Sequence, residues 1–271
     1  MKRTSILALL VLILAVGALP AAAITGGYVD EDTHPNVGLM VADIDGEPEW
    51  RCSGTLIAPR VFLTAGHCTG DGATGARVWF DTNLTGNVEY PYGGETSYEG
   101  TPIPHFLYAW SGGDHHDVGV VILDEPVEGI EPATLATADL LGQLKKDRVL
   151  EGGYEEGVYF TSVGYGGTLA DWPPPELAYD RIRRWSESEY VALTPFHLHL
   201  FQRAVFEEDG SCFGDSGGPI FWVDPEDPEG EEILVAVTST GDMQCIASGL
   251  DYRVDIPDIL DWIKLQIEEN K

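Results

Sequence analysis

A serine surrounded by glycines stands in the C-terminal third of the chain, in the segment Gly214-Asp215-Ser216-Gly217-Gly218-Pro219. Glycines let a backbone turn sharply, so a hydroxyl can stand exposed beside free backbone N–H groups. This pattern indicates a nucleophile with an oxyanion hole. The same letters fit the G-x-S-x-G motif of α/β-hydrolases, which places its histidine after the serine. All seven histidines here precede Ser216, so the order excludes that fold.

A serine hydroxyl attacks well only when a base removes its proton, and a carboxylate must fix the tautomer of an imidazole base. His67, in Thr64-Ala65-Gly66-His67-Cys68, is the candidate base. Asp117 is the candidate carboxylate, since it precedes the apolar run 118–123. A charge at the mouth of a buried strand has to be paired.

Two acidic segments raise the question of a bound metal. Asp114, His115, His116 and Asp117 are consecutive, but neighbouring residues of a strand point to opposite faces and cannot all reach one ion. The run 224–232 is rich in oxygen ligands of the kind that calcium takes. Its two prolines favour a solvated turn between strands, and calcium binding there stays open. We expect no metal and no cofactor.

The elements that must position these residues are mostly strands. The chain has 271 residues with 32 glycines and 17 prolines, and its apolar runs are short. Strands are predicted at 37–41, 60–63, 118–123, 158–163, 219–223 and 233–238. A terminal helix is predicted because Pro257 suits a first turn and one face carries Ile256, Ile259, Leu260, Ile263 and Ile267. Residues 125–148 are expected to connect two halves. The fold class is all-β with one closing helix.

The order His67, Asp117, Ser216 resembles that of the chymotrypsin/trypsin family of serine endopeptidases, in a secreted member of bacterial type. Other segments also resemble the family pattern: Ile24-Thr25-Gly26-Gly27, Cys52-Ser53-Gly54-Thr55-Leu56-Ile57, Thr161-Ser162-Val163-Gly164-Tyr165-Gly166, Ser239-Thr240-Gly241 and Tyr252-Arg253-Val254. The resemblance implies two packed six-stranded antiparallel β-barrels and a C-terminal α-helix. The expected limits are a signal peptide at 1–23, barrels at 24–135 and 136–254, and the helix at 255–271.

The resemblance also implies a role for each catalytic residue. Ser216 would attack the scissile carbonyl, His67 would act as general base and then acid, and Asp117 would orient His67. The backbone N–H groups of Gly214 and Ser216 would form the oxyanion hole, and Ser239 would hydrogen bond Asp117.

Disulfides and activation follow from the same resemblance. It implies that Cys52 pairs with Cys68 and that Cys212 pairs with Cys245. It also implies that Asp215 forms an ion pair with the free amine of Ile24, which shapes the oxyanion hole and the pocket. Because Ala23 precedes Ile24 directly, removal of the signal would release this amine, and we expect an enzyme without a zymogen stage.

The specificity pocket is implied at Ser239, Thr240, Gly241 and Gly249, with Gly210 at the floor position six residues before Ser216. Glycine at the floor and on the walls leaves room for a bulky side chain. We therefore predict cleavage after large apolar residues. Asp251, near the pocket base, and Asp242, on the rim, could instead recruit Lys or Arg.

Residues 1–23 combine Lys2 and Arg3, an apolar run at 6–19 and Ala21-Ala22-Ala23, the three parts of a secretory signal. The run is short for a bilayer span of about 20 residues, and Pro20 closes it, so a membrane anchor is disfavoured. We expect a secreted protein, extracellular or periplasmic. In an oxidising compartment four cysteines favour two disulfides.

The formal net charge of −30 excludes nucleic acid and anionic membranes as partners, because phosphates would be repelled. The expected partners are peptide or protein substrates, together with protein inhibitors that could occupy the same site. We expect a monomer. Two alternatives stay open: a secreted binding protein that keeps the fold without turnover, and an esterase.

Overall fold

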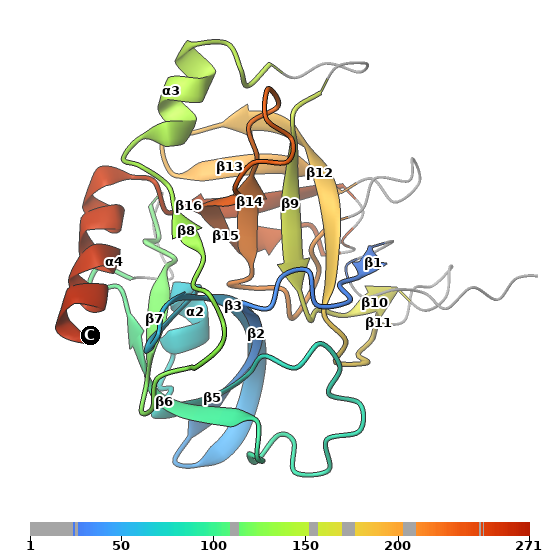
Figure 1. The fold of residues 1–271 in the computed structure, drawn as a ribbon, viewed down its shortest axis with the longest axis vertical. Coiled ribbons are helices and arrows are strands. Elements are labelled where there is room, and N and C mark those ends of the chain that lie inside the picture. Colours follow the sequence, from blue (N-terminus) through green and yellow to red (C-terminus); the bar gives the residue numbers. More distant parts are fainter. Residues whose placement is uncertain are drawn as a thin grey trace, which may run out of the picture.

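The computed structural model describes Ile24 and residues 27–108, 114–151, 157–169, 177–202, 210–243, 245 and 247–271. The predicted signal segment 1–23 lies outside the described residues. Two β-barrels form the body of the molecule, one mainly from the N-terminal half and one from the C-terminal half (Figure 1). The prediction of an all-β fold with two six-stranded barrels is confirmed.

The first barrel closes in the order β2-β3-β4-β7-β6-β5 with antiparallel neighbours. Its strands are β2 (Val37–Ile44), β3 (Glu47–Ala58), β4 (Val61–Thr64), β5 (Gly75–Trp79), β6 (Ser97–Pro104) and β7 (Gly119–Leu123). Leu56, Phe62 and Val78 pack inside it and exclude water.

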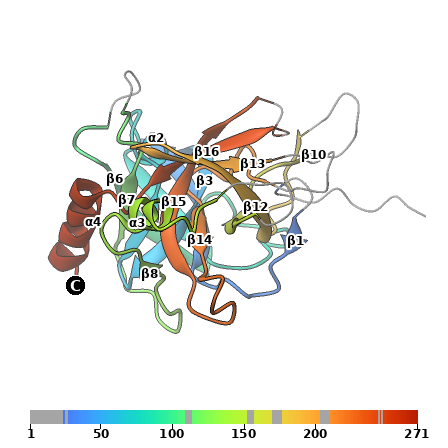
Figure 2. The same ribbon diagram turned by 90° about the horizontal axis from the view of Figure 1, so that it is seen from above.

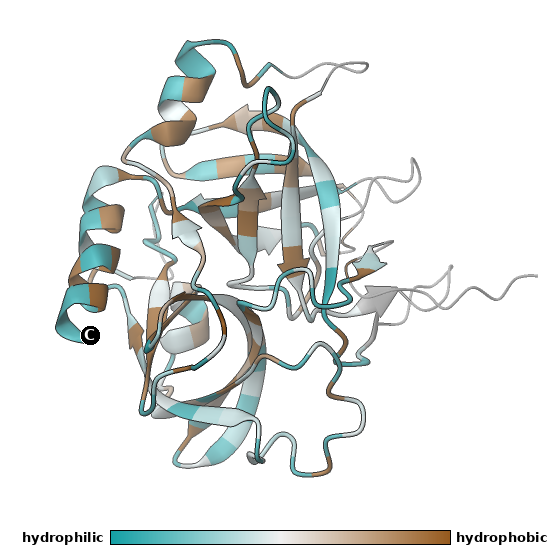
Figure 3. Ribbon diagram, viewed as in Figure 1, coloured by the Kyte–Doolittle hydropathy of each residue, from teal (hydrophilic) through white to brown (hydrophobic). Residues whose placement is uncertain are grey.

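The second barrel closes in the order β9-β12-β13-β16-β15-β14, because β12 pairs with β9 as well as with β13. Its strands are β9 (Tyr159–Gly164), β12 (Arg184–Leu193), β13 (His197–Phe201), β14 (Pro219–Trp222), β15 (Ile233–Gly241) and β16 (Ser248–Arg253). Hydrophobic segments, brown in Figure 3, run along these strands, and Leu198, Ile220 and Val235 are buried in one apolar cluster of the barrel.

In the described part of the chain, four short strands lie outside the two rings. β1 (Tyr28–Val29) pairs with β12, so the N-terminal segment joins the sheet of the second barrel before the chain enters the first. β8 (Thr134–Leu135) runs parallel to β15. β10 (Thr168–Leu169) and β11 (Leu177–Ala178) form a separate hairpin.

The predicted terminal helix is α4 (Pro257–Glu269), with Pro257 in its first turn. It lies at the edge of the molecule beside β6 and β7 (Figures 1 and 2). Its buried Ile259 and Ile263 share one apolar cluster with Val120 of the first barrel and Val237 of the second. The helix therefore helps to hold the two barrels together.

The sequence does not predict two further short helices, α2 (Gly66–Thr69) and α3 (Leu140–Lys146). Both are too short to produce a readable helical period. The backbone N–H of Leu141 in α3 donates 2.8 Å to the carboxylate of Asp255, which is far away in sequence. Such a cap can be seen only once the fold is known.

Candidate active site

His67, Asp117 and Ser216 come from both barrels. His67 lies on α2 directly after β4, and Asp117 lies just before β7. Ser216 lies on the loop that leads into β14. His67 and Ser216 both line two adjoining cavities of about 300 and 390 Å³, so the structure brings them to one cleft.

The imidazole of His67 is held by Asp117. Its Nδ1 lies 3.1 and 3.0 Å from the two carboxylate oxygens, and the backbone N–H of His67 donates 2.8 Å to Oδ1. The Ser239 hydroxyl donates 2.5 Å to Oδ2. Burial raises the pKa of Asp117, but the hydrogen bonds from His67 and Ser239 outweigh it, and the pKa is lowered. Asp117 is therefore a carboxylate at neutral pH.

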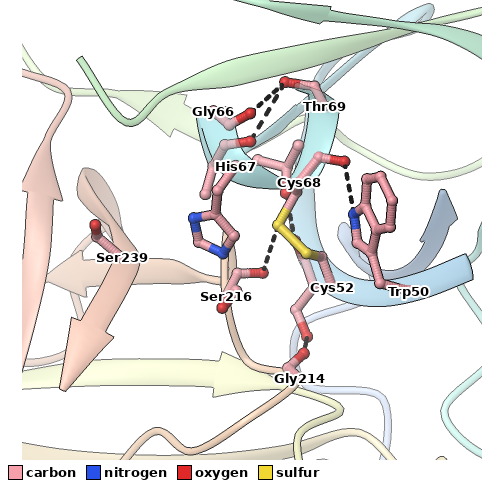
Figure 4. Close-up of a disulfide and its surroundings, with 12 residues drawn as sticks. Trp50, Cys52, Gly66, His67, Cys68, Thr69, Gly214, Ser216 and Ser239 are labelled. Atoms are coloured by element: carbon pink, nitrogen blue, oxygen red, sulfur yellow. Dashed lines mark hydrogen bonds between the residues drawn. A yellow bond between two sulfur atoms is a disulfide. The ribbon is translucent and has the colours of Figure 1, made fainter. Parts of the chain in front are cut away.

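The other edge of the His67 ring turns towards Ser216, with the Cys52–Cys68 disulfide beside them (Figure 4). With Nδ1 engaged by Asp117, the remaining ring nitrogen is the one that could take the Ser216 proton. The geometry thus provides a carboxylate, an oriented imidazole and a hydroxyl in the order that acyl transfer requires.

The loop around Ser216 depends on glycine. Gly217 has φ +78°, and a β-carbon there would lie 1.9 Å from Thr64 Oγ1. Gly214 has φ +98°, and its carbonyl accepts a 3.0 Å hydrogen bond from the Ser53 hydroxyl. Within the described part of the chain, the backbone amides of Gly214 and Ser216 donate to no other residue. They are available to an oxyanion.

Two disulfides flank this loop and the histidine helix. Cys52 of β3 bonds to Cys68 of α2, and Cys212 bonds to Cys245. The first fixes the base of α2 against the first barrel, and the second ties the segment before Ser216 to the segment after β15. The sulfurs of Cys52 and Cys68 lie within 4.8 Å of a His67 ring nitrogen, but their disulfide leaves no thiolate to bind a metal.

Asp215 and Ile24 are both buried. The carboxylate of Asp215 accepts the backbone N–H of Gly166 at 2.7 Å and that of Cys212 at 2.8 Å. Burial raises the pKa of Asp215 to about 6. In this chain the amine of Ile24 is still joined to Ala23, and no hydrogen bond or ion pair among the described residues links Ile24 to Asp215.

The predicted pocket residues fall into two groups. Ser239, Thr240 and Gly241 line the smaller cavity directly. Gly210 and Gly249 lie against Gln202 instead, because β-carbons built on them would lie 2.3 and 2.7 Å from its side chain. Gln202 was missed by the sequence reasoning, because it follows β13 in a segment without a recognisable motif.

The larger cavity is also lined by two residues that the sequence does not single out, Arg51 and Tyr179. The guanidinium of Arg51 stacks on the ring of Tyr179, 3.6 Å from its centroid, and both line the cavity next to Gly214 and Ser216. The segment 114–117 does not gather around one point. Asp114 accepts the Tyr252 hydroxyl at 3.0 Å, whereas Asp117 binds His67.

A sequence model of the trypsin family matches residues 26–263. The chain belongs to the trypsin family. It is therefore a serine endopeptidase, and its substrates are peptides or proteins. None of the helices that the structure describes is long and apolar enough to cross a membrane.

Within the trypsin family, the chain is similar to Serine protease 1 of Drosophila melanogaster, with 28% identity over 89% of this chain and 84% of that protein. It is also similar to Lectizyme of Glossina austeni, with 23% identity over 94% of this chain and 90% of that protein. Among solved structures it resembles HL collagenase, with a TM-score of 0.62 and 20% identity over 92% of this chain and 97% of that one. At that identity the likeness concerns the fold alone.

Proposed function

We propose that the protein is a secreted endopeptidase that cleaves peptide bonds with Ser216, His67 and Asp117 as its catalytic triad. The observation that carries the proposal is the contact of His67 with Asp117 on one side, while His67 and Ser216 line the same cleft. A protein that only binds ligands would need neither the His67–Asp117 contact nor a cleft shared by His67 and Ser216.

In the proposed reaction, Ser216 Oγ attacks the scissile carbonyl carbon while the free ring nitrogen of His67 takes its proton. The carbonyl oxygen becomes an oxyanion that the amides of Gly214 and Ser216 stabilise, each contributing about 3 kcal/mol in comparable sites. His67 then gives its proton to the leaving amine, and the acyl group stays on Ser216. Water, deprotonated by His67, attacks this ester and releases the acid.

Two finer features belong to the proposal. The first is a preference for large apolar residues on the acyl side of the cleaved bond, supported by the open wall at Gly241 and by Phe213 and Met243 on the cavity. The second is activation on export. Removal of residues 1–23 would free the amine of Ile24 for Asp215, whose buried carboxylate holds two backbone N–H groups.

The decisive experiment is covalent labelling with a peptidyl phosphonate, which reacts only with an activated serine. We expect stoichiometric labelling of Ser216 in the purified secreted protein, loss of peptide cleavage on labelling, and neither effect in Ser216→Ala. A binding protein without turnover would stay unlabelled. An esterase would be labelled and would hydrolyse an ester, but it would leave the matched peptide intact.

A further inference from the structure

The segment that carries Asp117 makes two tight bends in the backbone. His116 has φ +46°, in the left-handed region that residues with a β-carbon rarely adopt. The backbone N–H of Val118 donates 2.8 Å to the His116 carbonyl, so Asp117 is the middle residue of a three-residue turn. Such a strained backbone persists only where its surroundings fix it.

The side chain of Asp114 supplies part of that support. Its Oδ1 accepts the backbone N–H of His116 at 2.9 Å and the hydroxyl of Tyr252 at 3.0 Å. The Nδ1 of the His116 ring lies 3.5 Å from the same oxygen. The first hydrogen bond closes an Asx turn within the segment, whereas the second ties this turn to a strand of the other barrel.

Tyr252 is a rigid anchor for that second hydrogen bond. It lies on β16, where its register partners are His197 of β13 and Val237 of β15. Its side chain is fully buried in the apolar cluster that joins the two barrels, which also contains Val118. In so closely packed a cluster the ring cannot move without disturbing both barrels. The hydroxyl of a buried tyrosine needs a partner, and here that partner is Asp114.

The hydroxyl of Tyr252 remains a donor over the pH range in which an imidazole base works. Burial raises the pKa of Tyr252 above its ordinary value, and the nearby carboxylates of Asp114 and Asp117 raise it further. The hydroxyl therefore keeps its proton at neutral and mildly alkaline pH. Because Tyr252 is fully buried, it does not touch the substrate, and any effect on catalysis must pass through its neighbours.

We propose that Tyr252 is a positioning residue for catalysis: by holding Asp114 it fixes the turn that places the Asp117 carboxylate against His67. This inference rests on the proposed catalytic function and adds a residue of the second barrel that supports the triad. Ser239 of that barrel donates to Asp117 directly, whereas Tyr252 acts through the backbone of residues 114–117. A displacement of about 1 Å can cost roughly 100-fold in rate, so a small shift of Asp117 should be visible in kcat.

The first test removes only the hydroxyl. In Tyr252→Phe we expect kcat for peptide cleavage to fall about tenfold while KM stays within about twofold, because the buried ring does not contact the substrate. Tyr190→Phe is the matched control, since Tyr190 is also buried on a strand of the second barrel but its hydroxyl hydrogen bonds the backbone of Leu193. The control should lose stability and keep its kcat. An unchanged kcat in Tyr252→Phe, or an equal fall in both variants, would overturn the inference.

A double-mutant cycle tests whether Tyr252 acts through Asp114. Asp114→Ala removes both hydrogen bonds, so it should lower kcat at least as much as Tyr252→Phe, and adding Tyr252→Phe to it should lower kcat no further. Asp114→Asn keeps an oxygen that accepts from both donors and should keep kcat within about threefold of wild type. The side chain of Asp114 is 21% exposed, so its variants provide the comparison even where Tyr252→Phe does not fold. Losses that multiply in the double variant would show another route and overturn the inference.

A spectroscopic measurement tests the positioning without turnover. In Ser216→Ala at low pH, proton NMR should show the proton between His67 Nδ1 and Asp117 as a separate downfield signal. Adding Tyr252→Phe should move this signal upfield or broaden it, and adding Tyr190→Phe should not, while thermal unfolding midpoints show that both variants fold. An unmoved signal, or no such signal in Ser216→Ala itself, would overturn the inference whether or not the enzyme cleaves peptides. Failure of Ser216 to react with a phosphonate would count against the proposed function alone.

Discussion

At the scale of single residues, Asp117 is the most constrained group of the cleft. Its two oxygens receive the ring and backbone nitrogens of His67 and the hydroxyl of Ser239, while its side chain is only 4% exposed. Protein donors thus take the place of water around the carboxylate, and together they hold the imidazole in one orientation. A buried anion with three donors stabilises a particular tautomer, which a neutral amide cannot do.

Asp117→Asn is accordingly expected to lower kcat by about 10³- to 10⁴-fold, because the amide would favour the tautomer with its proton facing Ser216. The rate of phosphonate labelling should fall in parallel. Asp114→Asn is the matched control, since Asp114 binds Tyr252 and not His67. A labelling rate within threefold of wild type in Asp117→Asn would remove Asp117 from the triad.

At the scale of elements, the N-terminal segment and the Ser216 loop meet the same pair of strands. The backbone N–H of Gly27 donates to the Ile24 carbonyl at 2.8 Å, and a β-carbon built on Gly27 would lie 2.8 Å from the backbone oxygen of Trp185 in β12. Trp185 pairs with Val163 of β9, and the next residue, Gly164, lies against Asp215. The N-terminal segment and the Ser216 loop therefore both lie against the β9–β12 pair.

This arrangement predicts that the enzyme needs the free amine of Ile24. A chain that keeps one extra alanine ahead of Ile24 should lose at least tenfold in kcat/KM, because the buried Asp215 would have no cation to pair with. Asp215→Asn should reduce activity similarly in the chain that begins at Ile24. An equal number of extra residues at the C-terminus is the control. Full activity of the extended chain would show that this pairing does not switch the enzyme on.

The same elements show what a sequence can and cannot predict. Apolar runs identify β2, β7 and β14, and spaced isoleucines identify α4, because burial on one face imposes a period. His67, Ser216 and Ser239 stand in motifs, so their meeting in the cleft could be expected from sequence. Gln202 could not, since its place beside Gly249 arises only when β13 and β16 pair.

At the scale of the whole molecule, one buried cluster joins the barrels to each other. Arg183, just before β12, donates to the carbonyls of Val37 and Phe80 in the first barrel at 3.0 and 2.9 Å, and to Asp30 at 2.8 Å. Asp30 also binds His34, whose Nε2 lies 3.3 Å from Glu232. The His34 ring stacks on Phe221 of β14 at 5.9 Å. Hydrogen-bonded ion pairs and one ring stack thus connect the N-terminal segment, both barrels and the acidic loop.

The free energy of unfolding of this assembly should fall as the pH becomes alkaline. Although burial opposes its charge, hydrogen bonds with Asp30 and Glu232 raise the pKa of His34 to about 9. Because the pKa is raised on folding, the stabilisation is complete below about pH 6.5 and is lost as the pH passes 9. In Ser216→Ala, which prevents self-digestion, the free energy of unfolding in urea should fall by up to about 3 kcal/mol between pH 6.5 and 9.5.

Replacing the ring without its charge separates this cause from general alkaline effects. His34→Phe keeps an aromatic ring against Phe221, and Arg183 still pairs with Asp30, so this variant should be less stable at pH 6.5 and nearly independent of pH up to 9.5. His199→Gln is the matched control. Burial lowers the pKa of His199, so its protonation changes mainly below this range and the variant should lose stability with pH as the parent does. If His34→Phe falls as steeply as the parent between pH 6.5 and 9.5, the alkaline loss originates elsewhere and the cluster holds the barrels by packing alone.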